Sequence, residues 1–222
     1  MKKIWILWWI WPEASAEFYK KLIIRIKEWW YIQSNKDFPN IIINSINAPE
    51  ILDAWDDNIS EYINGIMDLR NLNVEYIYMI CNTIHIFYDK IGHQTNTTKI
   101  VDLRQLLYNR LINISKKVCI LWTENTINSG MYNFNNIDYV SIPNNIQKNI
   151  QSWIMLFNSW KCYQNEKDII KKYISDHKDV IYICWCTEIQ ELTWIQNIQN
   201  ITFIETTDLF IEDIIKKVYS TS

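Results

Sequence analysis

Short apolar runs alternate with amphipathic stretches along the whole chain, and this pattern predicts alternating strands and helices. The run at residues 4–10 is apolar almost throughout, as in a strand buried on both faces. In the following stretch, residues 13–28, Phe18, Leu22 and Ile26 recur at helical spacing, and lysines occupy the other face. The chain therefore opens with a strand and an amphipathic helix.

The same alternation continues to the C-terminus. It predicts further strands at residues 40–44, 76–80, 100–101, 117–121, 139–142, 180–184 and 202–204. It predicts further helices at residues 60–71, 102–115, 127–132, 146–158, 166–176 and 207–219. We therefore expect an α/β fold in which mostly parallel sheets are flanked by helices, with functional residues beyond the carboxyl ends of the strands.

Two cysteines mark similar corners in the two halves of this pattern. Cys81 ends one predicted strand and Cys186 ends another, 105 residues later, and each begins a polar triplet that leads into a helix. We therefore expect two subdomains. Residues 1–97 plus 206–222 would carry Cys81, and residues 98–205 would carry Cys186.

Composition adds one unusual feature, because the chain has twelve tryptophans and only three glycines. Glycine and tryptophan together make up about 7% of the chain, which is the usual share of glycine alone. Replacing each Trp of residues 4–15 by Gly turns the segment into a strand that enters a glycine-rich turn, which an indole would obstruct. We hypothesise that the gene follows an alternative genetic code in which UGA encodes glycine, and that these codons were translated here as tryptophan. The alternative is a genuinely Trp-rich protein.

Charge and cysteine content exclude several classes of protein. With 22 basic and 25 acidic residues and no basic run, the chain lacks the signature of a nucleic-acid-binding protein. Five cysteines without framework spacing fit a reduced, cytoplasmic setting better than a disulfide scaffold. The N-terminus imitates a signal peptide with small residues at 14–16, but the likeness fades when glycine is restored, and no other run approaches a membrane span.

The chemistry that these observations suggest is carried by thiols. A cysteine at a strand end and helix start meets unpaired N–H groups that stabilise the thiolate. Two such thiols facing each other across a cleft suit two-base racemisation, which needs no metal or other cofactor. The remaining cysteines, Cys119, Cys162 and Cys184, are expected to be small buried apolar groups.

With Trp replaced by Gly, the chain resembles the aspartate/glutamate racemase family along nearly its whole length. The matching segments are residues 4–15 (I-G-I-L-G-G-I-G-P-E-A-S), 81–85 (C-N-T-I-H), 121–130 (L-G-T-E-N-T-I-N-S-G) and 185–188 (G-C-T-E). The resemblance implies two pseudo-symmetric α/β subdomains with the active site between them. It also implies cofactor-independent interconversion of the L and D forms of an amino acid, aspartate or glutamate, by a homodimer.

The resemblance also implies a set of site residues. The acid/base thiols would be Cys81 and Cys186, the carboxylate would be bound by Asn82, Thr83 and Thr187, and Thr123 would belong to a turn that closes over substrate. Glu188 would orient the substrate ammonium or a catalytic group.

Some positions depart from the family pattern and put an acidic substrate in doubt. Between Asn44 and Trp55 there is no Arg or Lys to bind a side-chain carboxylate. Asn158 replaces an expected lysine, and Lys161 is either its substitute or a solvated helix-end residue. His85 either acts on the thiolate or substrate or is a satisfied, partly buried histidine, whereas His93 and His177 are expected at the surface.

Three other functions remain open from the sequence. The restored turn invites a Rossmann nucleotide site, but its glycine spacing differs from G-x-G-x-x-G and strand two ends in Asn44 rather than an acid. The same fold could serve a decarboxylase or cis–trans isomerase of a small dicarboxylate, or a binding protein without catalysis. Three scattered histidines make a metal site improbable.

Overall fold

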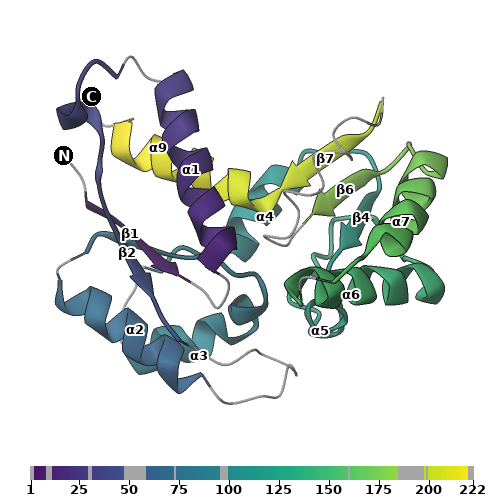
Figure 1. The fold of residues 1–222 in the computed structure, drawn as a ribbon, viewed down its shortest axis with the longest axis horizontal. Coiled ribbons are helices and arrows are strands. Elements are labelled where there is room, and N and C mark those ends of the chain that lie inside the picture. The colour runs from purple at the N-terminus through teal and green to yellow at the C-terminus, as the bar shows by residue number, and fades with distance from the viewer. Residues whose placement is uncertain are drawn as a thin grey trace. The chain divides into compact units, whose positions relative to one another are not determined.

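The computed structural model describes residues 3–8, 12–29, 32–47, 59–72, 74–95, 100–159, 161–184, 198 and 200–219 (Figure 1). For residues 3–8, 12–14, 29 and 158 it describes the backbone alone. The chain divides into two compact units, each with its own sheet. Unit 1 comprises Met1–Leu103 and Thr207–Ser222, and unit 2 comprises Arg104–Thr206.

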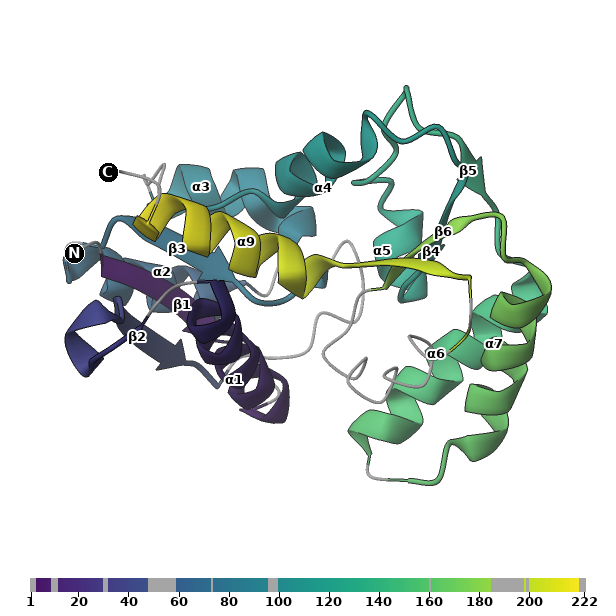
Figure 2. The same ribbon diagram turned by 90° about the horizontal axis from the view of Figure 1, so that it is seen from above.

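Unit 1 is built on a parallel sheet with the strand order β2-β1-β3 (Figure 2). The central strand β1 (Lys3–Trp8) pairs with β2 (Asn40–Ser45) on one side and with β3 (Tyr76–Met79) on the other. Beyond β3, Ile100 forms a single parallel bridge with Ile77. All these strands run in the same direction, so their carboxyl ends meet at one edge.

Helices cover both faces of this sheet, as the sequence predicts. In Figure 1, α1 (Pro12–Trp29) and α9 (Thr206–Tyr219) lie on one face, and α2 (Ser60–Asn71) and α3 (Tyr88–Thr95) lie on the other. The predicted stripe of α1 is buried, with Phe18, Leu22 and Ile26 at most 2% exposed. The apolar spacing of the sequence thus fixes which face of α1 packs inward.

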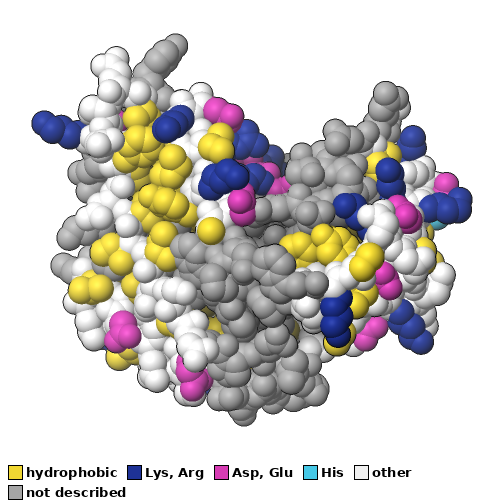
Figure 3. Space-filling model, in the orientation of Figure 1, with side chains coloured by type: hydrophobic (Ala, Val, Ile, Leu, Met, Phe, Trp, Pro, Cys, Tyr) yellow, Lys and Arg dark blue, Asp and Glu magenta, His cyan; other side chains and the backbone are white. Residues whose placement is uncertain are grey.

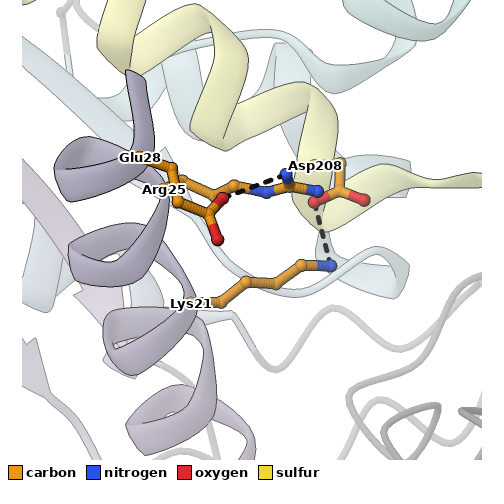
Figure 4. A network of polar contacts seen from close by, with 4 residues as sticks. All are labelled: Lys21, Arg25, Glu28 and Asp208. Carbon is orange, nitrogen blue, oxygen red and sulfur yellow. Dashed lines mark hydrogen bonds and ion pairs between the residues drawn. The ribbon is translucent and has the colours of Figure 1, made fainter. Parts of the chain in front are cut away.

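Polar contacts join α9 to the rest of unit 1. Lys21 of α1 forms an ion pair with Asp208 in the first turn of α9 at 2.9 Å, and Arg25 contacts Glu28 within α1 at 3.4 Å (Figure 4). Figure 3 shows charged side chains gathered over this part of α1 and α9. The Lys21 and Asp208 side chains are 32% and 29% exposed, and those of Arg25 and Glu28 are 42% and 55% exposed. Solvent therefore reaches both pairs, and each adds at most about 1 kcal/mol to the free energy of unfolding.

Unit 2 has a four-stranded parallel sheet with the order β5-β4-β6-β7. Its strands are β4 (Val118–Leu121), β5 (Tyr139–Val140), β6 (Ile181–Cys184) and β7 (Thr202–Glu205). Its helices are α4 (Leu103–Leu111), which begins at the boundary with unit 1, α5 (Glu124–Asn128), α6 (Asn144–Asn158) and α7 (Gln164–Asp176). The largest described core cluster lies between this sheet and helices α6 and α7.

The two units repeat one topology. In each, the first strand is central, the second lies on one side and the third on the other. A fourth position follows the third strand, as β7 in unit 2 and as the Ile100 bridge in unit 1. The expected α/β fold with parallel sheets flanked by helices is confirmed. In each sheet the second and third strands lie on opposite sides of the first, and ligands of such sheets bind where the chain changes direction in this way.

Two sequence-based boundaries differ from the structure. We expected the chain to leave the first subdomain after residue 97, but the structural division falls after Leu103. The reason is that the Val101 N–H donates to the Ile77 carbonyl at 2.8 Å and keeps this segment on the sheet of unit 1. The helix expected at residues 127–132 instead begins at Glu124. Thr123 caps its start, and beyond its end Gly130 adopts a left-handed φ of 66°.

Candidate functional site

The first of three candidate corners belongs to unit 1 and lies just beyond β3. Cys81 follows the last residue of this strand, Met79, by two positions and is half-buried against the core cluster beneath it. Asn82 is buried and precedes the 3-10 helix η2 (Thr83–Phe87), which leads directly into α3. Cys81, Asn82 and Thr83 therefore stand at a strand end and helix start, the setting predicted for a reactive thiol.

His85 comes nearer to the second of its two expected roles, that of a structural histidine, but it is fully rather than partly buried. Its ring has no exposed surface, and Nε2 lies 3.2 Å from the carbonyl oxygen of Met79. A ring without exposed surface cannot contact a substrate directly. His93 and His177 are both exposed, as expected.

The second corner lies beyond β4, where Thr123 begins helix α5. The Thr123 hydroxyl oxygen accepts a hydrogen bond from the Thr126 N–H at 3.4 Å, and its own O–H donates to the Thr126 hydroxyl at 3.0 Å. The Gln147 side chain of α6 donates to the carbonyl of residue 122 at 2.8 Å, which ties this turn to the start of α6. Thr123 is thus placed at the carboxyl end of a central strand, on a turn fixed from two sides.

A cavity of about 360 Å³ adjoins this second corner. Glu124, Thr126 and Gln147 contribute to its polar wall, and Tyr132 and Tyr139 to its aromatic wall. Sequence reasoning singled out neither Thr126 nor Gln147. Thr126 could have been found from its repetition of Thr123 in T-E-N-T, whereas Gln147 becomes relevant only because α6 begins beside β4.

The third corner follows β6. That strand ends at Cys184, and Cys186 follows by two positions, the same offset that separates Cys81 from the end of β3. Cys186, Thr187 and Glu188 themselves lie outside the described residues. The strand that leads to them is the third strand of unit 2, equivalent to β3 in unit 1.

Lys161 lies in the short connection between α6 and α7 and is exposed. The cavity adjoins the first turn of α6, whereas Lys161 follows its last turn. Because α6 has 15 residues, the two are separated by roughly 20 Å along the helix. Lys161 therefore does not line this cavity.

Burial makes two of the other cysteines unreactive. Cys119 and Cys184 are at most 2% exposed, and desolvation raises the pKa of Cys119 to about 12 and the pKa of Cys184 well above its usual range. Both are structural, as expected. The same expectation was wrong for Cys162, which is exposed because it lies between α6 and α7 rather than in a strand.

Among the twelve tryptophans, the side chains of Trp122 and Trp153 are described, and both are buried. Trp122 packs edge-on against Tyr132 with ring centroids 4.3 Å apart, and the Trp153 indole N–H has no hydrogen-bond partner. Among the described residues, Asn200 is the non-glycine residue with a left-handed φ, so neither tryptophan has a backbone that requires glycine. The obstruction expected from the tryptophans within residues 4–15 concerns side chains outside those that the structure describes.

No helix within the described ranges combines the length and the apolar content that crossing a membrane requires.

Comparison with known proteins gave one curated relative and several solved structures, and no family model matches the chain. The broad specificity amino-acid racemase RacX of Bacillus subtilis (strain 168) is 26% identical over 124 residues, 54% of each chain. The match thus spans about half the length of this relative. The Picrophilus torridus aspartate racemase superimposes with a TM-score of 0.79 over 98% of this chain and 94% of its own, at 21% identity.

The fold extends to at least one enzyme of another class. A Gly-to-Cys mutant of arylmalonate decarboxylase superimposes with a TM-score of 0.51 over 98% of this chain and 93% of its own, at 7% identity. The fold by itself therefore does not specify the reaction. The chain has the fold of the aspartate/glutamate racemase family and a sequence relationship to an amino-acid racemase.

Proposed function

We propose that this protein is a cofactor-independent amino-acid racemase in which Cys81 and Cys186 exchange a proton with Cα. The observation that carries the proposal is the equivalence of two corners. Each cysteine stands two residues beyond the third strand of a sheet with the same strand order. A curated relative that is named an amino-acid racemase supports the same chemistry.

In the proposed reaction, one thiolate removes the Cα proton and becomes a thiol. The electron pair left on carbon is delocalised into the substrate carboxylate. The other thiol then donates its proton to the opposite face of the carbon and becomes a thiolate, so charge and protons balance over one turnover. The reverse reaction uses the same two groups with their roles exchanged.

The polar residues of the corners would hold the substrate. Asn82 and Thr83, which begin η2, would bind its carboxylate together with Thr187, while Thr123 would close over it. Glu188 would orient the substrate ammonium or a catalytic group. Charge-assisted hydrogen bonds to the carboxylate would stabilise the carbanion formed in the transition state.

We further propose aspartate or glutamate as the substrate, with Lys161 as the partner of the side-chain carboxylate. The named activity of the P. torridus relative supports this choice, and the exposed position of Lys161 leaves its ammonium group accessible. We propose a cytoplasmic location, since reactive thiols stay reduced in a reducing compartment. We also propose a homodimer, as the resemblance to the racemase family implies.

A decarboxylase acting on a small dicarboxylate is the second candidate, favoured by the likeness to arylmalonate decarboxylase. Such an enzyme breaks a C–C bond and protonates one face, so a single thiol suffices. A non-catalytic binding protein of the same fold would perform neither reaction. The three functions differ in what they do to the Cα–H bond of an amino acid.

Incorporation of solvent deuterium at Cα separates these functions. The wild-type protein, Cys81→Ser and Cys186→Ser are incubated in D₂O with each enantiomer of the common amino acids, and Cys162→Ser serves as the matched control because that thiol is exposed. We expect the wild type and the control to label both enantiomers. We expect each active-site variant to lose racemisation by at least about 100-fold, the usual contribution of an acid/base group.

If each variant still exchanges the Cα proton of one enantiomer, the result would show which thiol faces which side of Cα, since the remaining thiol can still remove a proton from its own side. Unchanged racemisation in either variant would refute the two-thiol assignment. CO₂ release from a dicarboxylate without Cα labelling of any amino acid would instead establish the decarboxylase.

A further inference from the structure

One residue holds both sides of the turn that carries Cys81. The His85 backbone N–H donates to the carbonyl of Asn82 at 2.8 Å, and its ring Nε2 lies 3.2 Å from the carbonyl of Met79. Cys81 lies between these two carbonyls in the chain. Two hydrogen bonds of His85, one from its ring and one from its backbone N–H, therefore hold the chain between the end of β3 and η2.

The donor and acceptor in the ring contact follow from its chemistry. A backbone carbonyl can only accept a hydrogen bond, so Nε2 carries the proton. The ring is fully buried, and its plane lies 11° from that of Tyr88, with centroids 6.1 Å apart. Tyr88 is itself fixed, because its hydroxyl donates to the Ile100 carbonyl at 3.0 Å. The ring of Phe210, in α9, also lies near, with its centroid 6.1 Å from that of His85.

We propose that His85 is a positioning residue for Cys81, which holds the turn between Met79 and Asn82 in the geometry that proton transfer requires. The proposal rests on the proposed racemase function. His85 has no exposed surface and touches no substrate, so it acts through the backbone on each side of the thiol. Without the Nε2 bond, the end of β3 would lose this side-chain link to η2.

Proton transfer from carbon is sensitive to such a change. The reacting atoms must approach to about 3–3.5 Å, and a displacement of about 1 Å lowers the rate by roughly 100-fold. Substrate binding also involves Asn82 on this turn, but a hydrogen bond to the carboxylate tolerates a small displacement better than proton transfer from carbon does. A positioning role therefore predicts a fall in kcat with little change in KM, whereas loss of a substrate contact would raise KM.

The test compares His85→Phe with His85→Gln and with a matched control. Phenylalanine keeps the aromatic volume and removes the donor, whereas the glutamine side chain places an N–H at a similar reach. The control is His177→Phe in unit 2, where Nδ1 lies 2.8 Å from the Tyr173 carbonyl and the ring lies against the Tyr173 ring. We measure kcat and KM at a temperature where thermal melts show every variant folded. We also measure the alkylation rate of Cys81 by peptide mass spectrometry.

For His85→Phe we expect kcat to fall at least about tenfold with KM within about twofold of wild type, and the Cys81 alkylation rate to change by more than about threefold. His85→Gln should recover most of kcat and the wild-type alkylation rate, and His177→Phe should match wild type in both. A folded His85→Phe variant with wild-type kcat and alkylation rate would overturn the proposal. So would a glutamine variant that recovers nothing.

The two readouts also separate the proposal from the function on which it rests. If the wild type racemises no amino acid, the proposed function fails, and the alkylation comparison still decides whether His85 sets the environment of the Cys81 thiol. If the wild type racemises amino acids but His85→Phe leaves both readouts unchanged, only the positioning role fails.

Discussion

The hydroxyl of Tyr78 offers a sharp test of how α9 is held on unit 1. Tyr78 lies in β3, its side chain is fully buried, and its O–H donates to the Asp213 carboxylate of α9 at 2.8 Å. Lys217, one turn further along α9, forms an ion pair with the same oxygen at 2.7 Å. Tyr78→Phe removes only this hydroxyl and keeps the edge-on contact of the ring with Phe210.

The expected loss follows from the type of bond. A hydrogen bond to a charged group contributes about 1.5–3 kcal/mol to the free energy of unfolding. Asp213 keeps its ion pair with Lys217 and part of its side chain is exposed, so water can replace some of the lost interaction. We therefore expect the lower end, about 1.5 kcal/mol, or roughly a tenfold change in the unfolding equilibrium.

Urea unfolding of Tyr78→Phe and of wild type measures the difference in their free energies of unfolding. The two units need not unfold together, so hydrogen exchange of the β3 amides is used to report on unit 1 separately. The matched control is Tyr219→Phe, whose hydroxyl donates to the backbone carbonyl of Asp37 at 3.1 Å near the surface. We expect the control to lose less than about 1 kcal/mol. A loss below about 0.5 kcal/mol for Tyr78→Phe, or one equal to that of the control, would show that this hydroxyl does not hold α9 on unit 1.

The pH dependence of the same variant gives a second check. Burial, followed by the charge of Asp213, raises the pKa of Tyr78 above its ordinary value of 10. The folded state then holds this proton more tightly than the unfolded state. The contribution of Tyr78 to stability is fully present below about pH 10 and is lost as the pH rises further. The stability difference between wild type and Tyr78→Phe should therefore narrow above about pH 10.

Two further predictions concern the thiols and the tryptophans. For a pKa near 12, the thiolate fraction of Cys119 at pH 8 is about 10⁻⁴, and both Cys119 and Cys184 are buried. Iodoacetamide should therefore alkylate the exposed Cys162 in the native protein but reach Cys119 and Cys184 only after unfolding. Rapid alkylation of Cys119 in the native protein would contradict its burial. The UGA hypothesis predicts that the intact mass of the protein from its native host corresponds to glycine at the twelve tryptophan positions, and that a chain with twelve tryptophans is poorly folded or inactive. A native mass that matches twelve tryptophans, or a soluble active enzyme that contains them, would reject it.

Local sequence patterns determined most elements of this protein. The helix at residues 60–71 was predicted with its observed bounds, and strands β2, β3 and β4 within one or two residues, because apolar periodicity reports directly which residues face a core. The position of Cys81 at a strand end and helix start was likewise readable, since both neighbouring elements are local. The equivalence of Cys81 and Cys186 was suggested by similar polar triplets and gains support from the matching strand order of the two sheets.

Other features depended on contacts between distant segments, which periodicity cannot report. Residues 100–101 stay with unit 1 because they pair with β3, and Cys162 is exposed in the connection between α6 and α7. His85 could not be assigned from sequence, because only the packing of Tyr88 and Phe210 around its ring shows that it is buried. Patterns within the sequence specify the local elements and suggest thiol chemistry. Tertiary structure decided which groups are desolvated and which backbone carbonyls they reach, because burial and hydrogen bonding depend on neighbours that are remote along the chain.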